Sequence, residues 1–84
     1  MSYIVNLSTC GNIDHGQNLY EPMYGVPSYT LGCQAIDECR KEVRDYIEHY
    51  DIGSGNWTGG QVYDDRGNLI GQIYYNGKFT QQNN

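Results

Sequence analysis

The sequence predicts a single small α+β domain over residues 1–84, with one amphipathic helix packed on a three- or four-stranded antiparallel sheet. Three observations predict it. Apolar residues alternate with less apolar ones near the N-terminus, and a helical period runs through the middle of the chain. Two turn signals divide residues 57–79 into short apolar and aromatic runs. Eighty-four residues leave no room for a second domain.

The N-terminal segment has the period of a half-buried strand. Tyr3, Val5 and Leu7 alternate with neighbours that are mostly polar, so we expect the first strand over residues 3–8. Residues 11–32 contain both prolines and show little periodicity. We expect either an irregular strand within residues 23–31, which the prolines would confine to a sheet edge, or a long surface loop.

The helix prediction rests on one apolar stripe at three- and four-residue spacing: Ile36, Cys39, Val43, Tyr46 or Ile47, and Tyr50. Acidic residues occupy its first turns, where the helix dipole favours negative charge. Gly53 follows the stripe and is the residue predicted to end the helix in a left-handed conformation. Three pairs of opposite charge at i,i+4 spacing are expected on the outer face: Asp37–Lys41, Lys41–Asp45 and Arg44–Glu48.

The last third of the chain predicts a three-stranded meander. Residues 61–63 are expected to pair with residues 69–75 across a turn at 64–68. Asn76-Gly77 has the composition of a two-residue type I′ turn, which returns the chain through residues 78–80. Together with the N-terminal strand, the meander completes the predicted sheet.

The charge balance limits the classes of partner. Ten acidic and five basic residues give a formal net charge of −5. Nucleic-acid phosphates and anionic membranes are bound through Lys and Arg, so direct binding to either is disfavoured. The N-terminus has no basic region and no long apolar run. We therefore expect a cytoplasmic protein with neither a signal peptide nor a membrane span.

The residues that commonly carry catalysis or metals do not form a recognised pattern. The spacings among Cys10, His15, Cys33 and Cys39 fit no zinc motif, and the last two would fall on different sides of one helix. We expect Cys39 in the core and the other cysteines as free thiols, although a Cys10–Cys33 bridge stays open. Neither His15 nor His49 has the neighbours of a catalytic group. The sequence predicts no enzyme, no metal and no cofactor.

A protein-binding surface is the function that remains. Tyr and Trp supply large contact areas at low entropic cost, and acidic side chains suit a basic partner. The candidate partner-binding residues are the helix-segment acids Asp37, Glu38, Glu42, Asp45, Glu48 and Asp51, the turn acids Asp64 and Asp65, and the aromatic residues Tyr20, Tyr24, Tyr29 and Trp57.

With these acids, many tyrosines and no active-site motif, the chain resembles the small phage and mobile-element proteins that inhibit host defence, of which anti-CRISPR proteins are the best known. The resemblance implies a stoichiometric inhibitor in the host cytosol. Such an inhibitor occupies a basic nucleic-acid-binding surface of a larger complex, with carboxylates where phosphates would sit.

A second hypothesis is a small homodimeric accessory module. A strand, a glycine-containing bend and a helix that begins near Cys33 give a likeness to antitoxins of the HicB type. No basic DNA-binding segment accompanies these elements. An inhibitor should lose affinity when helix acids such as Glu42 and Asp45 are reversed, whereas an accessory module should fail when Tyr24 or Trp57 becomes Ala.

Overall fold

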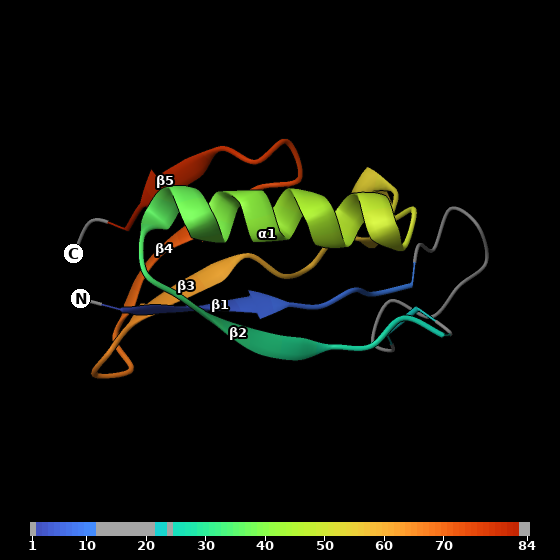
Figure 1. Ribbon diagram of the computed structural model, residues 1–84. Helices are drawn as coiled ribbons and strands as arrows, with labels where there is room; N and C mark the ends of the chain where they lie inside the picture. Colours follow the sequence, from blue (N-terminus) through green and yellow to red (C-terminus); the bar gives the residue numbers. More distant parts are fainter. Residues whose placement is uncertain (1, 12–21, 24, 83–84) are drawn as a thin grey trace.

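The computed structural model describes residues 2–11, 22–23 and 25–82 of the chain. The elements along this part of the chain are drawn in Figure 1. They are β1 (Tyr3–Leu7), β2 (Tyr29–Cys33), α1 (Ile36–His49), the short 3-10 helix η2 (Ser54–Asn56), β3 (Gln61–Asp64), β4 (Leu69–Ile73) and β5 (Phe79–Gln81).

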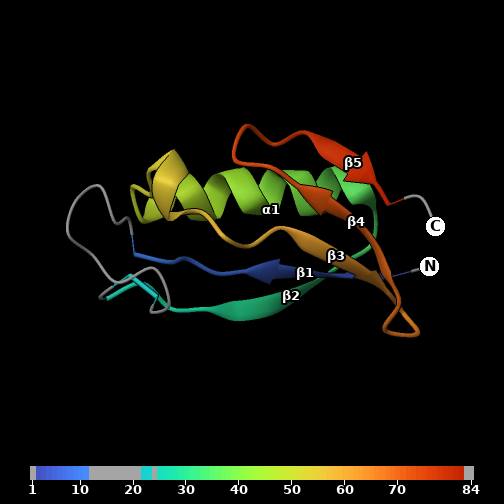
Figure 2. The ribbon, with the colours of Figure 1, turned by 180° about the vertical axis from the view of Figure 1, so that it is seen from behind.

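The strands form one antiparallel sheet in the order β2-β1-β3-β4-β5. The helix α1 lies along one side of this sheet in both views (Figures 1 and 2). The α+β fold predicted from the sequence is therefore confirmed, with five strands in place of three or four. The additional strand is β2, which follows Pro27 and takes the edge position predicted for the irregular segment.

The core lies between α1 and the facing side of the sheet. It comprises Val5, Leu7, Cys33, Cys39, Val43, Tyr46, Ile47, Ile52, Val62 and Ile73. The helix stripe is confirmed, because its middle residues are all buried and its two ends, Ile36 and Tyr50, pack at the margin. The helical period left open whether Tyr46 or Ile47 belongs to the apolar stripe. Both are buried, because the sheet is wide enough to cover a broad stripe.

Both hairpins of the meander close with a single left-handed glycine. In the β4–β5 turn the N–H of Gly77 donates to Tyr74 O at 2.8 Å, and Tyr74 N–H donates to Lys78 O at 2.9 Å. Gly77 has a φ of 88°, whereas Asn76 does not take a positive φ. The predicted type I′ turn, which needs two positive φ values, is therefore wrong. The β3–β4 turn has the same arrangement, with Gly67 at the left-handed position.

The helix ends in a Schellman motif at Asp51, not at Gly53 as the sequence predicted. Asp51 has a φ of 52°, and its N–H donates to Glu48 O at 3.3 Å. The next N–H, of Ile52, donates to Ile47 O at 2.9 Å. This reversal of the chain places the Ile52 side chain in the core. Burial of Ile52 therefore favours a left-handed conformation at Asp51, two residues before Gly53.

Gly60 lies where the backbones of β1 and β4 approach it closely on both sides. Its N–H donates to Asn6 O at 2.6 Å, and its carbonyl accepts from Ile73 N–H at 2.8 Å. A Cβ at Gly60 would collide with the Ile73 carbonyl oxygen, and the residue has a φ of 95°. The segment before β3 therefore requires glycine both for space and for conformation.

We predict that Gly60→Ala lowers the free energy of unfolding by more than about 2 kcal/mol, because it adds a backbone collision to a disfavoured φ. Gly67→Ala is the matched control. Gly67 has a φ of 83°, but a Cβ there meets nothing within 4 Å, so only about 1 kcal/mol is expected. Urea unfolding of both variants measures the difference, and equal losses would contradict this account of Gly60.

Candidate partner-binding surface

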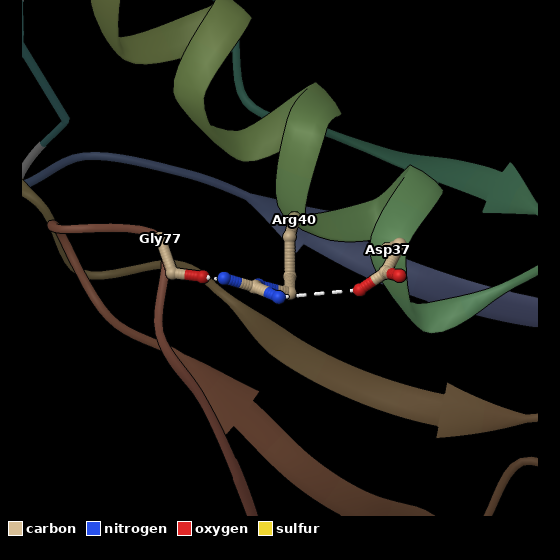
Figure 3. A network of polar contacts seen from close by, with 3 residues as sticks. All are labelled: Asp37, Arg40 and Gly77. Carbon is tan, nitrogen blue, oxygen red and sulfur yellow. Dashed lines mark hydrogen bonds and ion pairs between the residues drawn. The ribbon is translucent and has the colours of Figure 1, made fainter.

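The two arginines of α1 are turned toward the β4–β5 turn. Arg40 Nε donates to the carbonyl of Gly77 at 2.7 Å, and its Nη1 lies 3.2 Å from Asp37 Oδ1 (Figure 3). One helical turn later, Arg44 Nη1 donates to the carbonyl of Tyr75 at 2.6 Å. The Arg44 guanidinium also lies 5.6 Å from the centre of the Tyr75 ring. Both guanidinium groups therefore form hydrogen bonds within the protein.

Two of the three expected ion pairs on α1 are confirmed. Lys41 Nζ lies 3.2 Å from Asp45 Oδ2, and Arg44 Nη2 lies 3.8 Å from Glu48 Oε1. The expected Asp37–Lys41 pair is wrong, because Asp37 pairs with Arg40, one residue before Lys41. These pairs are exposed and add little to stability, so their main effect is to place the charges.

The opposite flank of α1, beside β2, carries acids without an arginine. Glu38, Glu42 and Asp45, which follow one another at four- and three-residue spacing, form this acidic flank. Because this flank lies near β2, its charges affect the thiol of Cys33, the last residue of that strand. Burial is the main cause that raises the pKa of the Cys33 thiol, and the charges of Glu38 and Glu42 raise it further.

An aromatic hollow of about 330 Å³ opens between this flank and β2. It is lined by Tyr29, Glu42, Asp45, Tyr46, His49 and Tyr50. Tyr29 comes from β2, and the other residues come from the middle and end of α1 and its C-cap. The hollow therefore combines two carboxylates with four rings, three of them phenols.

The rings around the hollow are held in place by edge-on contacts. The centre of the Tyr46 ring lies 5.8 Å from that of Tyr29 and 5.1 Å from that of Tyr50, at interplanar angles of 82° and 62°. His49 meets Tyr50 at 4.6 Å and 89°. The Tyr46 hydroxyl donates to the carbonyl of Pro27 at 2.6 Å, and burial raises its pKa to about 12. The ring cluster is thus largely preorganised.

Glu42 and Tyr29 are the members of this surface that remain available to a partner. The Glu38 carboxylate accepts from Gln34 N–H at 2.9 Å, which stabilises the start of α1, and Asp45 is paired with Lys41. Within the described part of the chain, Glu42 has neither a hydrogen bond nor an ion pair, and it is half-buried. Tyr29 leaves 44% of its surface exposed although its ring contacts Tyr46.

The other aromatic candidates have different positions. Trp57 is half-buried against the core, where its Nε1 donates to Ile73 O at 3.3 Å and its ring centre lies 6.0 Å from that of Tyr46. It supports the ring cluster from inside. Tyr20 and Tyr24 lie outside the described residues.

The remaining acidic candidates do not gather on one face. Asp37 and Glu48 lie on the arginine side of α1, and Asp51 ends the helix. Asp64 and Asp65 belong to the β3–β4 turn, which lies at the end of the sheet where α1 begins, far from Asp51 (Figures 1 and 2). The structure therefore brings together Glu42, Asp45 and Tyr29 from the sequence-predicted set, with Glu38 adjacent on the same flank.

The Asp64 side chain forms its hydrogen bonds within its own turn. Its Oδ1 accepts from the N–H groups of Arg66 and Asn68, both at 2.9 Å, and its Oδ2 accepts from Asn68 Nδ2 at 3.2 Å. These hydrogen bonds, led by that from the Asn68 N–H, hold the pKa of Asp64 below its ordinary value. Asp65 is exposed at the tip of the turn.

Three residues of the hollow were missed as partner-binding candidates. The apolar stripe placed Tyr46 and Tyr50 at the core, which is confirmed for Tyr46, and His49 was considered as a catalytic group. A pattern in the sequence could have predicted them, because acidic and aromatic residues recur along one side of the helix. These residues are Glu42, Asp45, Tyr46, His49 and Tyr50.

The cysteines are all free, and Cys39 is buried as predicted. Cys33 ends β2 instead of lying on the helix, so its thiol meets that of Cys39 in the core; the expectation that the two point to different sides is wrong. Burial raises the pKa of both thiols, which keeps them protonated. Within residues 2–11, 22–23 and 25–82, no three His, Cys, Asp or Glu side chains are grouped to hold a metal ion. His15 lies outside this range.

No helix in the described part of the chain combines the length and the apolarity that crossing a bilayer requires. No family model, curated protein or solved structure matches the chain. The surface beside α1 and β2 therefore has to be interpreted from its own chemistry.

We predict that Asp64→Asn destabilises the protein at neutral pH, and that the difference from wild type shrinks as the pH falls below 3.8, the ordinary pKa of the group. A carboxylate with a lowered folded-state pKa stabilises the fold above its unfolded-state pKa, and loses that contribution as the pH drops through the folded-state value. Urea midpoints across this range measure the difference. A gap that stays constant at every pH would show that the Asp64 charge has no part in closing the turn.

Proposed function

We propose that this protein is a non-enzymatic, protein-binding inhibitor of the anti-CRISPR kind, which docks its acidic flank and aromatic hollow on a basic nucleic-acid-binding surface of a larger complex. The observation that carries the proposal is the sorting of charge on α1. The arginines are bound to the β4–β5 turn, and Glu42 lines the hollow without an ion pair in the described part of the chain, because the neighbouring Lys41 is paired with Asp45.

The chemistry of the hollow suits an arginine or lysine side chain of the partner. A cation that enters it meets the Glu42 carboxylate and the exposed ring of Tyr29 together. A charged hydrogen bond and a cation–π contact then act on the same group. Because the rings are already packed, little ordering entropy is lost when the partner binds.

Burial and net charge both favour such a complex. Glu42 is half-buried, so an ion pair formed there is screened less than the exposed pairs elsewhere on α1. The net charge of −5 attracts a basic surface over a longer range and raises the association rate. Specificity then comes from the shape of the hollow and the position of Tyr29.

Direct nucleic-acid binding is a poorer explanation of the same surface. Of the five basic residues, Arg40 and Arg44 are bound to turn carbonyls and Lys41 is paired with Asp45. The two that remain, Arg66 and Lys78, belong to different turns and form no groove. An acidic binder of a basic protein is consistent with this distribution.

The alternative is a homodimeric accessory or antitoxin-like module of the HicB type. It would bind its partner mainly through apolar and aromatic contacts, so reversal of Glu42 would leave its affinity unchanged. The two functions are therefore separated by the charge dependence of partner binding.

The test begins with affinity capture from bacterial lysates that carry CRISPR and other defence systems, at low and moderate salt, followed by mass spectrometry. We expect a nucleic-acid-handling complex whose recovery falls as salt rises. Affinity for that complex is then measured for Glu42→Lys, which we expect to weaken binding at least about tenfold. Glu48→Lys, the same charge change on the arginine side of α1, should alter it less than about threefold.

Two results would overturn the proposal. One is an equal effect of Glu42→Lys and Glu48→Lys, which would mean that only net charge matters and the acidic flank does not dock. The other is a captured complex whose affinity depends on neither variant nor on salt, which would favour the accessory module. Circular dichroism of both variants confirms that the comparison is made between folded proteins.

A further inference from the structure

The face of the sheet that α1 leaves uncovered has a composition unlike the rest of the molecule. Side chains that alternate with the core residues of β1 and β3 point to it, as does Gln72 of β4. The register shift between β3 and β4 brings Leu69 to the same face, opposite Tyr63. We define this open face by Ile4, Asn6, Gln61, Tyr63, Leu69 and Gln72. None of the six is charged, although the chain carries a net charge of −5.

An apolar row crosses the open face. Tyr63 of β3 lies opposite Ile4 of β1 on one side and opposite Leu69 of β4 on the other. Ile4 is 41% exposed and Leu69 is 40% exposed. Tyr74, 46% exposed, borders a shallow hollow together with Leu69 and Gln72. Three of the four large hydrophobic residues exposed in the described part of the chain thus lie on or beside this face.

A row of neutral polar side chains runs next to the apolar row. Asn6 Nδ2 donates to Gln61 Oε1 at 2.9 Å, and Gln61 lies opposite Gln72 in the neighbouring strand. Gln72 in turn lies opposite Thr80 of β5. Side-chain amides both donate and accept hydrogen bonds, so two copies of such a row can pair with each other without a change of charge.

We propose that the open face is a self-association surface, on which a second copy of this chain packs face to face. A symmetric contact brings each surface patch against itself, so a patch of like charges repels its copy. The open face is free of that repulsion because its residues are neutral. Its apolar row supplies buried area and its amide row supplies hydrogen bonds.

Another symmetric arrangement, pairing through the edge strand β2, is disfavoured by charge. The acidic flank lies directly beside β2, so edge pairing would bring Glu38, Glu42 and Asp45 of the two copies toward one another. Face-to-face packing instead leaves both α1 helices on the outside of the dimer. Each copy then keeps its acidic flank and aromatic hollow accessible, and one dimer can engage two basic sites.

The size of the face sets the expected affinity. From strand spacing and rise, five short strands offer roughly 500 Å² per copy. A typical stable interface uses about 800 Å² per partner, so we expect a weak dimer with a dissociation constant in the micromolar range.

Analytical ultracentrifugation from about 1 µM to about 500 µM, a range that covers weak interfaces, tests the proposal. We expect a monomer–dimer equilibrium whose dissociation constant rises at least about tenfold in Leu69→Lys, which places a charge in the apolar row. Tyr74→Lys is a second variant should Leu69→Lys not fold. Tyr29→Lys is the control, because Tyr29 of β2 is equally exposed but lies on the α1 side of the sheet, away from the open face.

A protein that stays monomeric over the whole range would overturn the proposal. Loss of the dimer in Tyr29→Lys but not in Leu69→Lys would do so as well, because it would place the contact at the β2 edge. Salt provides an independent check: a dimer built on neutral groups should not weaken between about 0.05 M and about 0.5 M NaCl. Weakening would show that charge pairs hold it together.

Discussion

The hydrogen bonds from Arg40 and Arg44 to the carbonyls of the β4–β5 turn set the arrangement of every other charge on α1. A turn carbonyl outside the strand ladder needs a donor, and a guanidinium is the strongest one that the helix can offer. Together with the burial of the apolar stripe, these two contacts fix the rotation of α1 about its axis. The stripe of Cys39, Val43 and Ile47 then faces the sheet, and the acidic flank faces β2.

The same contact depends on the glycine in that turn. Gly77 supplies the left-handed conformation, and a Cβ there would come within 3.2 Å of the Arg44 side chain. The turn and the helix are thus fitted to each other, and the acids on the far flank are left without a basic neighbour other than Lys41. The proposed docking surface and the proposed self-association surface both follow from how α1 packs, because it covers one face of the sheet and leaves the other open.

Local patterns predicted much of this fold and little of the candidate surface. The stripe from Ile36 to Tyr50 and the alternation at Tyr3, Val5 and Leu7 are repeated within a few residues, so they could be recognised. The helix end at Asp51 could not, because the burial of Ile52 decides it. Charge sorting is also non-local: the acceptor of Arg40 lies 37 residues away, and Tyr29 reaches the hollow from a different strand.

Docking of a cationic side chain in the aromatic hollow can be tested without knowledge of the natural target. Backbone amide signals of the protein are followed by NMR while a short arginine-rich peptide is added at low salt. We predict that the largest shifts occur around Tyr29, Glu42 and Tyr50, and that Glu42→Lys removes them while Glu48→Lys does not. Shifts centred on the exposed turn acid Asp65, or spread evenly over all acidic residues, would contradict it.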